Sequence, residues 1–389
     1  MNNGGTMLTI DFQTHNARSR EIWKAYNEGK PIRVPVTIYA DARNWMHEKG
    51  ENVRGVTLSD YLQDKDLMFE CQVKAQEWIR HNILSDDGMG YPEEEGWSVI
   101  VDFQNYLEPV WFGGEVTYGL EPHALAFLND GNKRLVFDKG IPGAFEGIGG
   151  KVKEYYDYFG EKLENYSYKG IPVKNVRMPY NMAGSDGPFT IACGIRGMEN
   201  FINDLLSDPD YAHELLDFIT TAIINRIKKV REYTGQKPAG FGIADDAIVL
   251  LSPALYSEFV LPCHKEIYEA LTPENGARSM HLCGNAQPFF PILEKELAIK
   301  SFDTGFPIKF EQLYDALSPD VQIIGGPQVA LLKFGTRAQV KEEVKRILTS
   351  GVMEKSKRFV LREGNALSPG TPPENIKAMY EACEEYGYY

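Results

Sequence analysis

From about residue 30 onward, short apolar runs alternate with long amphipathic stretches along this chain. Apolar runs of about four to eight residues are typical of buried strands, and the longer stretches have the spacing of helices that bury one face. Strands and helices in alternation indicate an α/β fold in which helices cover a parallel sheet. The expected strands are Val34–Tyr39, Ser98–Phe103, Val176–Pro179, Thr190–Cys193, Gly240–Ala244, Arg278–Cys283, Ile299–Asp303, Val321–Gly325 and Phe359–Leu361.

About eight such units in one chain of 389 residues favour a closed (β/α)8 TIM barrel. A doubly wound open sheet is the alternative, but no G-x-G-x-x-G motif opens a first βα unit to support it. No repeat or linker divides the chain. We therefore expect an N-terminal extension at residues 1–30 and one barrel domain at residues 31–389, with an insertion at about 120–175.

Several helix starts carry recognisable capping signals. Asp208-Pro209 and Ser252-Pro253 each place a capping side chain before a proline at the first helical position. Thr336 with Gln339, and Thr371 with Glu374, each have the spacing of a capping box. These signals predict four helix N-termini at defined positions.

The bulk composition is that of an ordinary globular protein, with 43% hydrophobic and 25% charged residues. The formal net charge of −14 argues against a nucleic-acid partner, whose phosphates attract clustered lysine and arginine. It argues equally against an anionic membrane surface. No apolar run approaches the roughly 20 residues that span a bilayer, and no signal peptide is visible, so we expect a cytoplasmic protein.

The cysteines are odd in number and widely scattered, which does not fit a disulfide framework and favours a reducing compartment. Only Cys283 has a metal-binding neighbour at a useful spacing, because His281 precedes it by two residues at a strand end. Residues i and i+2 of a strand point to the same side. Imidazole nitrogen and thiolate sulfur together favour zinc over calcium or magnesium. The alternative is a buried histidine and cysteine without metal.

Polar groups recur where the expected strands end, and in a TIM barrel such ends share one face that carries the catalytic groups. Asp245 and Asp246 follow one strand, and Cys283 and Asp303 follow the next two. Gly325-Gly326-Pro327 and Glu363-Gly364-Asn365 follow the last two strands.

An ordered set of motifs carries a resemblance to a known family. These motifs are Gly187-Pro188-Phe189-Thr190, Arg196-Gly197-Met198-Glu199-Asn200-Phe201, Asp208-Pro209, Asp245-Asp246, Ser252-Pro253, Pro262-Cys263-His264-Lys265, His281-Leu282-Cys283-Gly284, Gly325-Gly326-Pro327 and Thr371-Pro372-Pro373-Glu374-Asn375-Ile376. Over about residues 175–389 the chain resembles the uroporphyrinogen decarboxylase superfamily, in its cobalamin-dependent methyltransferase branch. Earlier residues match more thinly.

The resemblance implies a zinc- and corrinoid-dependent methyltransferase. Enzymes of this branch exchange a methyl group between a small substrate and the cobalt of a corrinoid, usually on a separate protein. The family's zinc ligands are the H-x-C pair, which matches His281 and Cys283, and a cysteine in a G-C segment near the C-terminus. Asn365 stands at that cysteine position in this chain.

An amide oxygen is a poor substitute for a thiolate on zinc, so three explanations remain open. A carboxylate completes the site, with Asp303 as first choice and Glu363 as second; or no metal binds; or zinc binds only with substrate. A site with one thiolate leaves the metal more electrophilic, which favours demethylation of an O-methyl donor over methylation of a thiol.

Further residues are candidates for substrate chemistry. One of Asp245 and Asp246 is expected to face the barrel mouth and act on a substrate proton, while the other caps a loop or helix. Arg43 has the chemistry to bind a carboxylate, and Asp102 and Gln104 share one side of an expected strand. Asn365 is a further candidate for substrate binding.

Two other functions are weighed. A uroporphyrinogen-type decarboxylase holds an acidic tetrapyrrole with arginines in a segment near its N-terminus. The corresponding segment of this chain is Ala40-Asp41-Ala42-Arg43-Asn44. Its Asp41 carboxylate would repel a polycarboxylate substrate. A metal-free binding protein of the same fold would explain Asn365. The expected partners are a small methylated substrate and a corrinoid protein, and a homo-oligomer is left open.

Overall fold

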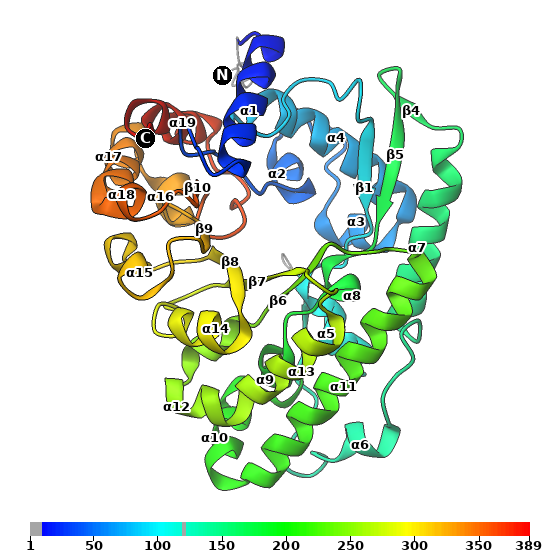
Figure 1. The fold of residues 1–389 in the computed structure, drawn as a ribbon. Coiled ribbons are helices and arrows are strands. Elements are labelled where there is room, and N and C mark those ends of the chain that lie inside the picture. The colour runs from blue at the N-terminus through cyan, green and yellow to red at the C-terminus, as the bar shows by residue number, and fades with distance from the viewer. Residues whose placement is uncertain (1–9, 119–121) are drawn as a thin grey trace.

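A five-stranded parallel sheet forms the centre of the computed structural model, which describes residues 10–118 and 122–389 (Figure 1). Its strand order is β10-β9-β8-β7-β6, so sequence neighbours lie side by side, as βαβ units require. The α/β class expected from the alternating pattern is confirmed. The strands are β6 (Gly240–Ala244), β7 (Ala277–Leu282), β8 (Ile299–Thr304), β9 (Gln322–Gly325) and β10 (Phe359–Leu361).

A second, smaller sheet lies beside the first. β1 (Trp97–Ile100) pairs in parallel with β5 (Ile171–Arg177), and β4 (Ser167–Tyr168) pairs with β5 in the antiparallel sense. β2 (Val116–Thr117) and β3 (His123–Ala124) form a separate hairpin. Within the described residues, these ladders are separate sheets and do not form one closed barrel.

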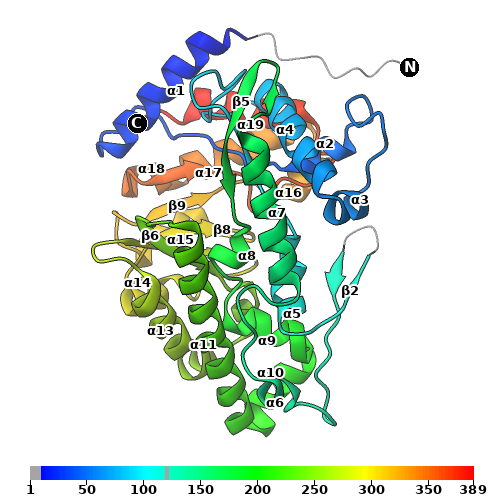
Figure 2. The same ribbon diagram turned by 90° about the vertical axis from the view of Figure 1, so that its right-hand side faces the viewer.

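Helices follow most strands and lie around the outside of the sheets (Figures 1 and 2). No helix in the described part of the chain combines the length and the apolar character needed to cross a membrane. The helices are α1 (Phe12–Asn27), α2 (Ala42–His47), α3 (Leu58–Gln63), α4 (Lys65–Asn82), α5 (Leu107–Trp111), α6 (Leu135–Lys139), α7 (Ile148–Leu163), α8 (Tyr180–Ala183), α9 (Pro188–Arg196), α10 (Met198–Ser207), α11 (Pro209–Thr234), α12 (Pro253–Leu255), α13 (Leu261–Leu271), α14 (Phe290–Leu297), α15 (Phe310–Ala316), α16 (Val329–Phe334), α17 (Arg337–Ile347), α18 (Met353–Lys355) and α19 (Pro373–Tyr386).

Three of the four capping signals are confirmed. Asp208 accepts the Tyr211 N–H at the start of α11, and Ser252 caps α12. The Thr336–Gln339 capping box forms at the start of α17. The fourth is wrong: α19 begins at Pro373, one residue later than expected, and the Thr371 hydroxyl donates back to the Ser368 carbonyl instead.

Two expected strands need correction. Residues 190–193 lie inside α9, because a short apolar run does not distinguish a strand from one buried turn of helix. Residues 34–39 do not form a regular strand and make one isolated bridge, the parallel bridge from Val36 to Leu361. The remaining expected strands are found, with ends shifted by a few residues; the largest shift is in β5, which begins at Ile171.

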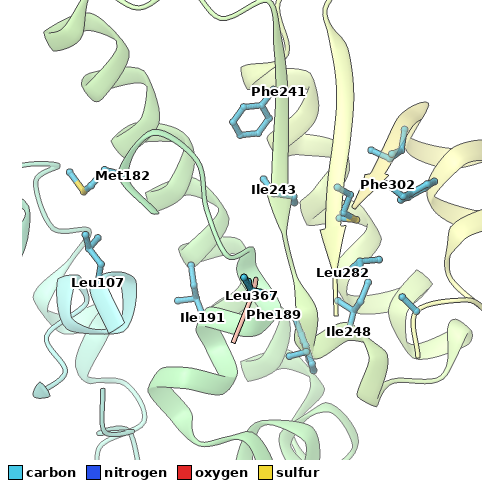
Figure 3. Close-up of a cluster of buried hydrophobic side chains, with 14 of the residues drawn as sticks. Leu107, Met182, Phe189, Ile191, Phe241, Ile243, Ile248, Leu282, Phe302 and Leu367 are labelled. Atoms are coloured by element: carbon cyan, nitrogen blue, oxygen red, sulfur yellow. The ribbon is translucent and has the colours of Figure 1, made fainter. Parts of the chain in front are cut away.

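The core lies between the strands and the helices that cover them. Side chains from α5, α8 and α9 lie on one flank of β6, and those from β7 and β8 lie on the other (Figure 3). Strands buried on both faces read as continuous apolar runs, which is why the sequence reveals them. The labelled side chains in Figure 3 are Leu107, Met182, Phe189, Ile191, Phe241, Ile243, Ile248, Leu282, Phe302 and Leu367, all buried.

Candidate metal centre

His281 and Cys283 leave the carboxyl end of β7 side by side. The His281 Nε2 and Cys283 Sγ atoms lie 3.1 Å apart, and both side chains are partly exposed. Because alternate residues of a strand face one way, the i, i+2 spacing brings the imidazole and the thiol together. The structure therefore has the arrangement of these two groups that the H-x-C motif predicts.

Asp246 completes a group of three possible ligands. Its Oδ1 accepts the Cys283 N–H at 2.7 Å and lies 3.8 Å from His281 Nε2. One ligand atom from each of these three residues lies within 4.8 Å of the other two. The strand register explains the arrangement, because Ala244 of β6 is paired with His281, and Asp246 follows two residues later.

The two carboxylates expected as third ligands lie elsewhere. Asp303 is the register partner of His281 on β8 and accepts a hydrogen bond from Nδ1 at 2.8 Å, on the opposite side of the ring from Cys283. Glu363 is fully buried, and its Oε1 accepts the Tyr39 N–H at 2.7 Å. Neither residue belongs to the candidate ligand group. Asp303 contacts Nδ1 of His281, whereas Cys283 lies at Nε2, and Glu363 is buried against the backbone of Tyr39.

The pKa values of the group follow from its hydrogen bonds and burial. Burial alone would lower the pKa of His281, but the hydrogen bonds with Asp303 and Cys283 outweigh it and raise this pKa to about 10. Burial raises the pKa of Cys283, although its contact with His281 opposes this shift. A metal ion at this site would have to displace a proton from both groups.

The adjacent aspartates diverge, and only one faces the strand-end site. Asp245 is fully buried and accepts hydrogen bonds from Phe189 N (3.1 Å), Thr190 N (2.7 Å) and Thr190 Oγ1 (2.7 Å) at the start of α9. It also contacts His264 Nε2 at 2.9 Å. Asp245 thus caps α9 from within the core, and Asp246 is the member of the pair that lies at the strand-end site.

The expected substrate-binding residues near the first strands are engaged with their own neighbours. Arg43 donates from Nε and one terminal nitrogen to both carboxylate oxygens of Asp41, at 2.6–3.1 Å. Asp102 accepts from Tyr61 Oη at 3.0 Å and from Gln104 Nε2 at 2.6 and 2.7 Å. Gln104 adopts a left-handed backbone with φ of 53°, a strained conformation that often accompanies functional sites.

Asn365 belongs to a segment that packs against the candidate metal group. A Cβ atom on Gly305 would lie 2.6 Å from the Cys283 Cα, and one on Gly364 would lie 3.1 Å from the Gly305 carbonyl. Glycines at these two positions therefore let the backbone of residues 364–365 approach the end of β7. Asn365 itself has a φ of 123°, and its Oδ1 accepts the Ala366 N–H at 2.8 Å.

Asp186 is a candidate residue that the sequence analysis missed. Its backbone N–H donates to the buried Glu108 carboxylate at 2.7 Å, and its Oδ2 accepts from Asn181 at 2.8 Å. The preceding residue pairs with β6, since the Ser185 carbonyl accepts the Ala244 N–H. Burial, with the nearby Glu108 and Asp246 carboxylates, raises the pKa of Asp186 well above its usual range. The Asp186-Gly187-Pro188 segment before α9 is a sequence signal for this turn, but the sequence analysis expected a strand at residues 190–193.

The donor set fits a transition-metal ion better than a hard cation. It offers one imidazole nitrogen, one sulfur and one carboxylate oxygen, the ligand types found at zinc sites. Three protein ligands with a further position for water or substrate are typical of catalytic zinc rather than structural zinc. The residues present therefore fit zinc, even though Asn365 replaces the expected cysteine.

Comparisons with known proteins place the chain in a family. The model of the family described as uroporphyrinogen decarboxylase (URO-D) matches residues 179–386, more than half of the chain. The chain belongs to the uroporphyrinogen decarboxylase family. The matched region contains α9, the central sheet and every residue of the candidate metal group. The superfamily expected from the sequence motifs is confirmed.

Two methyltransferases are among the most similar relatives within this family. The methylated-thiol–coenzyme M methyltransferase of Methanosarcina mazei is 28% identical over 207 residues, covering 51% of this chain and 51% of the relative. The methylcobamide:CoM methyltransferase MtbA of Methanosarcina acetivorans is 23% identical over 240 residues, covering 59% and 68%. The chain thus spans about half the length of the first relative.

A decarboxylase and a solved structure complete the comparison. Uroporphyrinogen decarboxylase 2, chloroplastic, of Arabidopsis thaliana is 25% identical over 238 residues, covering 58% of each chain. A solved structure of a methyltransferase from Methanosarcina mazei superposes with a TM-score of 0.63 at 19% identity, covering 95% of this chain and 98% of that one. At this identity the superposition shows a shared fold.

Proposed function

We propose that this protein is a corrinoid-dependent methyltransferase. It would move a methyl group between a small methylated substrate and the cobalt of a separate corrinoid protein. The observation that carries the proposal is the group of Asp246, His281 and Cys283 at the ends of adjacent parallel strands. Relatives named as a coenzyme M methyltransferase and a methylcobamide:CoM methyltransferase support it.

We also propose that the two sheets are arcs of one (β/α)8 barrel whose mouth carries this site. The Val36–Leu361 bridge joins the segment after the N-terminal helix to β10. The hydrogen bond from Ala244 N–H to the Ser185 carbonyl joins β6 to the segment that follows β5. These two links extend the central sheet beyond both of its edge strands, as closure into a barrel would require. Residues 1–30 and about 120–175 would be the N-terminal extension and the insertion of this barrel.

Zinc bound by Asp246, His281 and Cys283 would act as a Lewis acid toward the heteroatom that carries the methyl group. Cys283 supplies one thiolate, and Asn365 replaces the second that the family pattern would provide. A site with a single thiolate donates less electron density, which suits the polarisation of an ether oxygen. We therefore propose an O-methyl donor and a demethylating direction.

Asp186 is the group we propose to deliver a proton to the departing heteroatom. Its Oδ2 accepts a hydrogen bond from Asn181, and its backbone N–H donates to Glu108. Its Oδ1 has no hydrogen-bond partner among the described residues. Arg226, the nearby cation, is engaged by Glu108 instead. A carboxyl group among other carboxylates, without a cation of its own, favours the protonated form and is suited to act as an acid.

Substrate-binding roles for Arg43, Asp102, Gln104 and Asn365 remain part of this proposal. The Asp41 carboxylate must share Arg43 with any bound anion, so Arg43 would contribute less to binding than an unpaired arginine. Asp102 and Gln104 form one hydrogen-bonded pair. The Asn365 Nδ2 has no hydrogen-bond partner among the described residues, which leaves it available to donate to a substrate oxygen. The five free cysteines are consistent with a reducing cytoplasm, which we propose as the location.

A metal and activity assay tests the proposed function. Purified protein should retain about one zinc ion per chain, and it should methylate a reduced corrinoid protein when supplied with an aryl methyl ether. Absence of zinc after loading with excess metal, with and without substrate, would favour the metal-free binding protein. Decarboxylation of uroporphyrinogen by the same preparation would favour the decarboxylase to which the chain is also related.

A further inference from the structure

A carboxylate–arginine pair stands directly behind the imidazole of the candidate metal group. Asp303 Oδ2 lies 2.8 Å from His281 Nδ1, and Asp303 Oδ1 accepts a hydrogen bond from Arg362. The three residues come from the ends of β7, β8 and β10. The Arg362 side chain is only 13% exposed, so water has little access to compete for this contact.

We propose that Asp303, held by Arg362, is a positioning residue that fixes the tautomer and orientation of His281 and so sets the metal affinity of the site. This inference rests on the proposed function, because it takes Asp246, His281 and Cys283 to be metal ligands. Nothing in the family match or the named relatives assigns a role to either Asp303 or Arg362.

The contact with Asp303 determines which nitrogen of the His281 ring carries the proton. A carboxylate only accepts hydrogen bonds, so Asp303 requires the N–H of the neutral imidazole to be on Nδ1. The lone pair is then on Nε2, the nitrogen that faces Cys283 Sγ at 3.1 Å and Asp246 Oδ1 at 3.8 Å. Asp303 therefore selects the tautomer that can bind a metal at the candidate site.

Asp303 is itself held in a fixed orientation. An aspartate held through one oxygen can still rotate, whereas Asp303 is held through both, by His281 on one side and Arg362 on the other. The direct pairing of His281 with Asp303 in the β7–β8 register brings the two side chains to one face. Arg362 thus fixes the ring angle of His281 without touching it.

Two glycines at the end of β9 let Arg362, at the end of β10, reach Asp303, at the end of β8. The intervening strand β9 ends in Gly325-Gly326, where no side chains stand between its neighbours. A Cβ on Gly326 would lie 2.2 Å from the Arg362 carbonyl, and one on Gly325 would lie 2.2 Å from Thr304 Oγ1. These glycines allow the ends of β8 and β10 to close around β9.

Charge balance is a second reason for the arginine. With metal bound, Asp246, Cys283 and Asp303 bring three negative charges into one small region of the molecule. Arg362 is the cation that pairs with Asp303. Loss of Arg362 would leave Asp303 free to turn toward other donors.

Zinc affinity, measured by competition with a chromogenic chelator, tests the inference without any activity assay. Asp303→Asn should weaken zinc binding by about 10- to 100-fold, the usual cost of losing such an outer partner. Arg362→Gln should weaken it by a smaller factor, and Arg362→Lys should recover part of that loss. Asp320→Asn is the matched control, because Asp320 pairs with Lys300 of the same strand at the exposed surface and should leave the affinity unchanged.

The nitrogen chemical shifts of His281 provide a readout that a merely structural role would not change. The wild-type protein loaded with zinc should show a protonated Nδ1 and a metal-bound Nε2, and the metal-free Asp303→Asn variant should show a mixture of neutral tautomers. Wild-type affinity in a folded Asp303→Asn or Arg362→Gln variant would overturn this inference and leave the proposed function standing. If wild-type protein bound no zinc, the proposed function and this inference would fall together.

Discussion

Cys283 contributes the single sulfur atom of the candidate ligand group, and its position depends on two separate features of the chain. The i, i+2 spacing aligns it with His281, and the Asp246 carboxylate accepts its backbone N–H. The sequence predicts the first feature because strand periodicity is local. The second depends on the register between β6 and β7, which a sequence alone does not provide.

Replacing Cys283 with serine should abolish zinc retention during dialysis. A serine hydroxyl is a harder ligand that keeps its proton at neutral pH, so His281 and Asp246 would be left to hold the ion alone. Elemental analysis of the dialysed protein measures the outcome. Cys71→Ser, in α4 and outside the candidate group, is the control and should retain zinc. Full retention by the Cys283 variant would exclude the thiolate as a ligand.

Replacing Asp186 with asparagine should slow methyl transfer from aryl methyl ethers while leaving zinc content unchanged. An amide cannot supply the proton that the departing phenoxide needs, and loss of a general acid costs about 10²- to 10⁴-fold in rate. The loss should be largest for electron-rich phenols, which are the poorest leaving groups. A uniform loss across a series of donors would indicate a structural role for Asp186 instead.

Glu363 predicts a pH dependence of stability. Burial raises its pKa to about 8, above an unfolded value near 4.3, so the folded state holds a proton that the unfolded state releases. Its contribution is therefore fully present below about pH 4 and is lost as the pH rises toward 8, by up to about 1.4 kcal/mol per pH unit.

Glu363→Gln, which imitates the protonated acid, should remove this dependence. Urea unfolding at pH 5 and pH 8.5 should show similar stabilities for the two proteins at the lower pH and a more stable variant at the higher one. Glu354→Gln, on the exposed face of the short helix α18, serves as the control. A variant that is less stable than wild type at pH 8.5 would show that Glu363 is folded as the anion.

At the scale of elements, α9 is held in place by a residue from a different unit of the chain. Asp245 follows β6, yet its carboxylate accepts the first free N–H groups of α9 and the Thr190 hydroxyl. The contact with His264 of α13 links a third element to this carboxylate. One buried side chain therefore joins a strand end and two helices.

Asp245→Asn should lower the free energy of unfolding by about 1–3 kcal/mol, because buried donors of α9 lose a carboxylate acceptor. The asparagine side chain would direct an N–H group toward the Phe189 and Thr190 donors, which in the wild-type protein donate to the Asp245 carboxylate. Urea unfolding followed by tryptophan fluorescence measures this loss. Asp210→Asn, on the exposed first turn of α11, should stay within about 0.5 kcal/mol of wild type. Wild-type stability in the first variant would contradict the capping role.

The wrong prediction of a strand at residues 190–193 and the correct predictions of β6 and β10 rest on the same kind of sequence pattern. Both kinds of segment are short and apolar, and only flanking signals distinguish a strand from a buried helical turn. Pro188 at the first position of α9 is such a signal, but the side chain that caps this helix is Asp245, which lies 55 residues after Thr190. Local capping, as at Asp208, was predictable because cap and helix are neighbours in sequence.

At the scale of the whole molecule, the two ends of the chain meet at a buried ion pair. Arg33 and Asp86 are in contact with both side chains fully buried, and Arg33 also lies 2.8 Å from Glu384 of α19. Tyr380 of the same helix donates to Asp86 at 3.0 Å. Helices α1 and α19 lie side by side at this end of the molecule, where Arg18 pairs with Glu384 (Figures 1 and 2). The sequence predicts a helix close to α19 but none at α1, and pairings across some 350 residues depend on how the whole chain folds back on itself.

Arg33→Met should therefore destabilise the whole domain rather than one end of it. The change leaves the Asp86 carboxylate buried without its cation, which costs about 3–5 kcal/mol. Adding Asp86→Asn should recover part of that loss, because the amide is neutral and still accepts the Val36 N–H. Urea unfolding followed by tryptophan fluorescence and by circular dichroism should give coincident transitions, since the pair joins both ends of one cooperative unit. Separate transitions for the two signals, or an Arg33→Met variant as stable as wild type, would show that the ends of the chain contribute little to the stability of the fold.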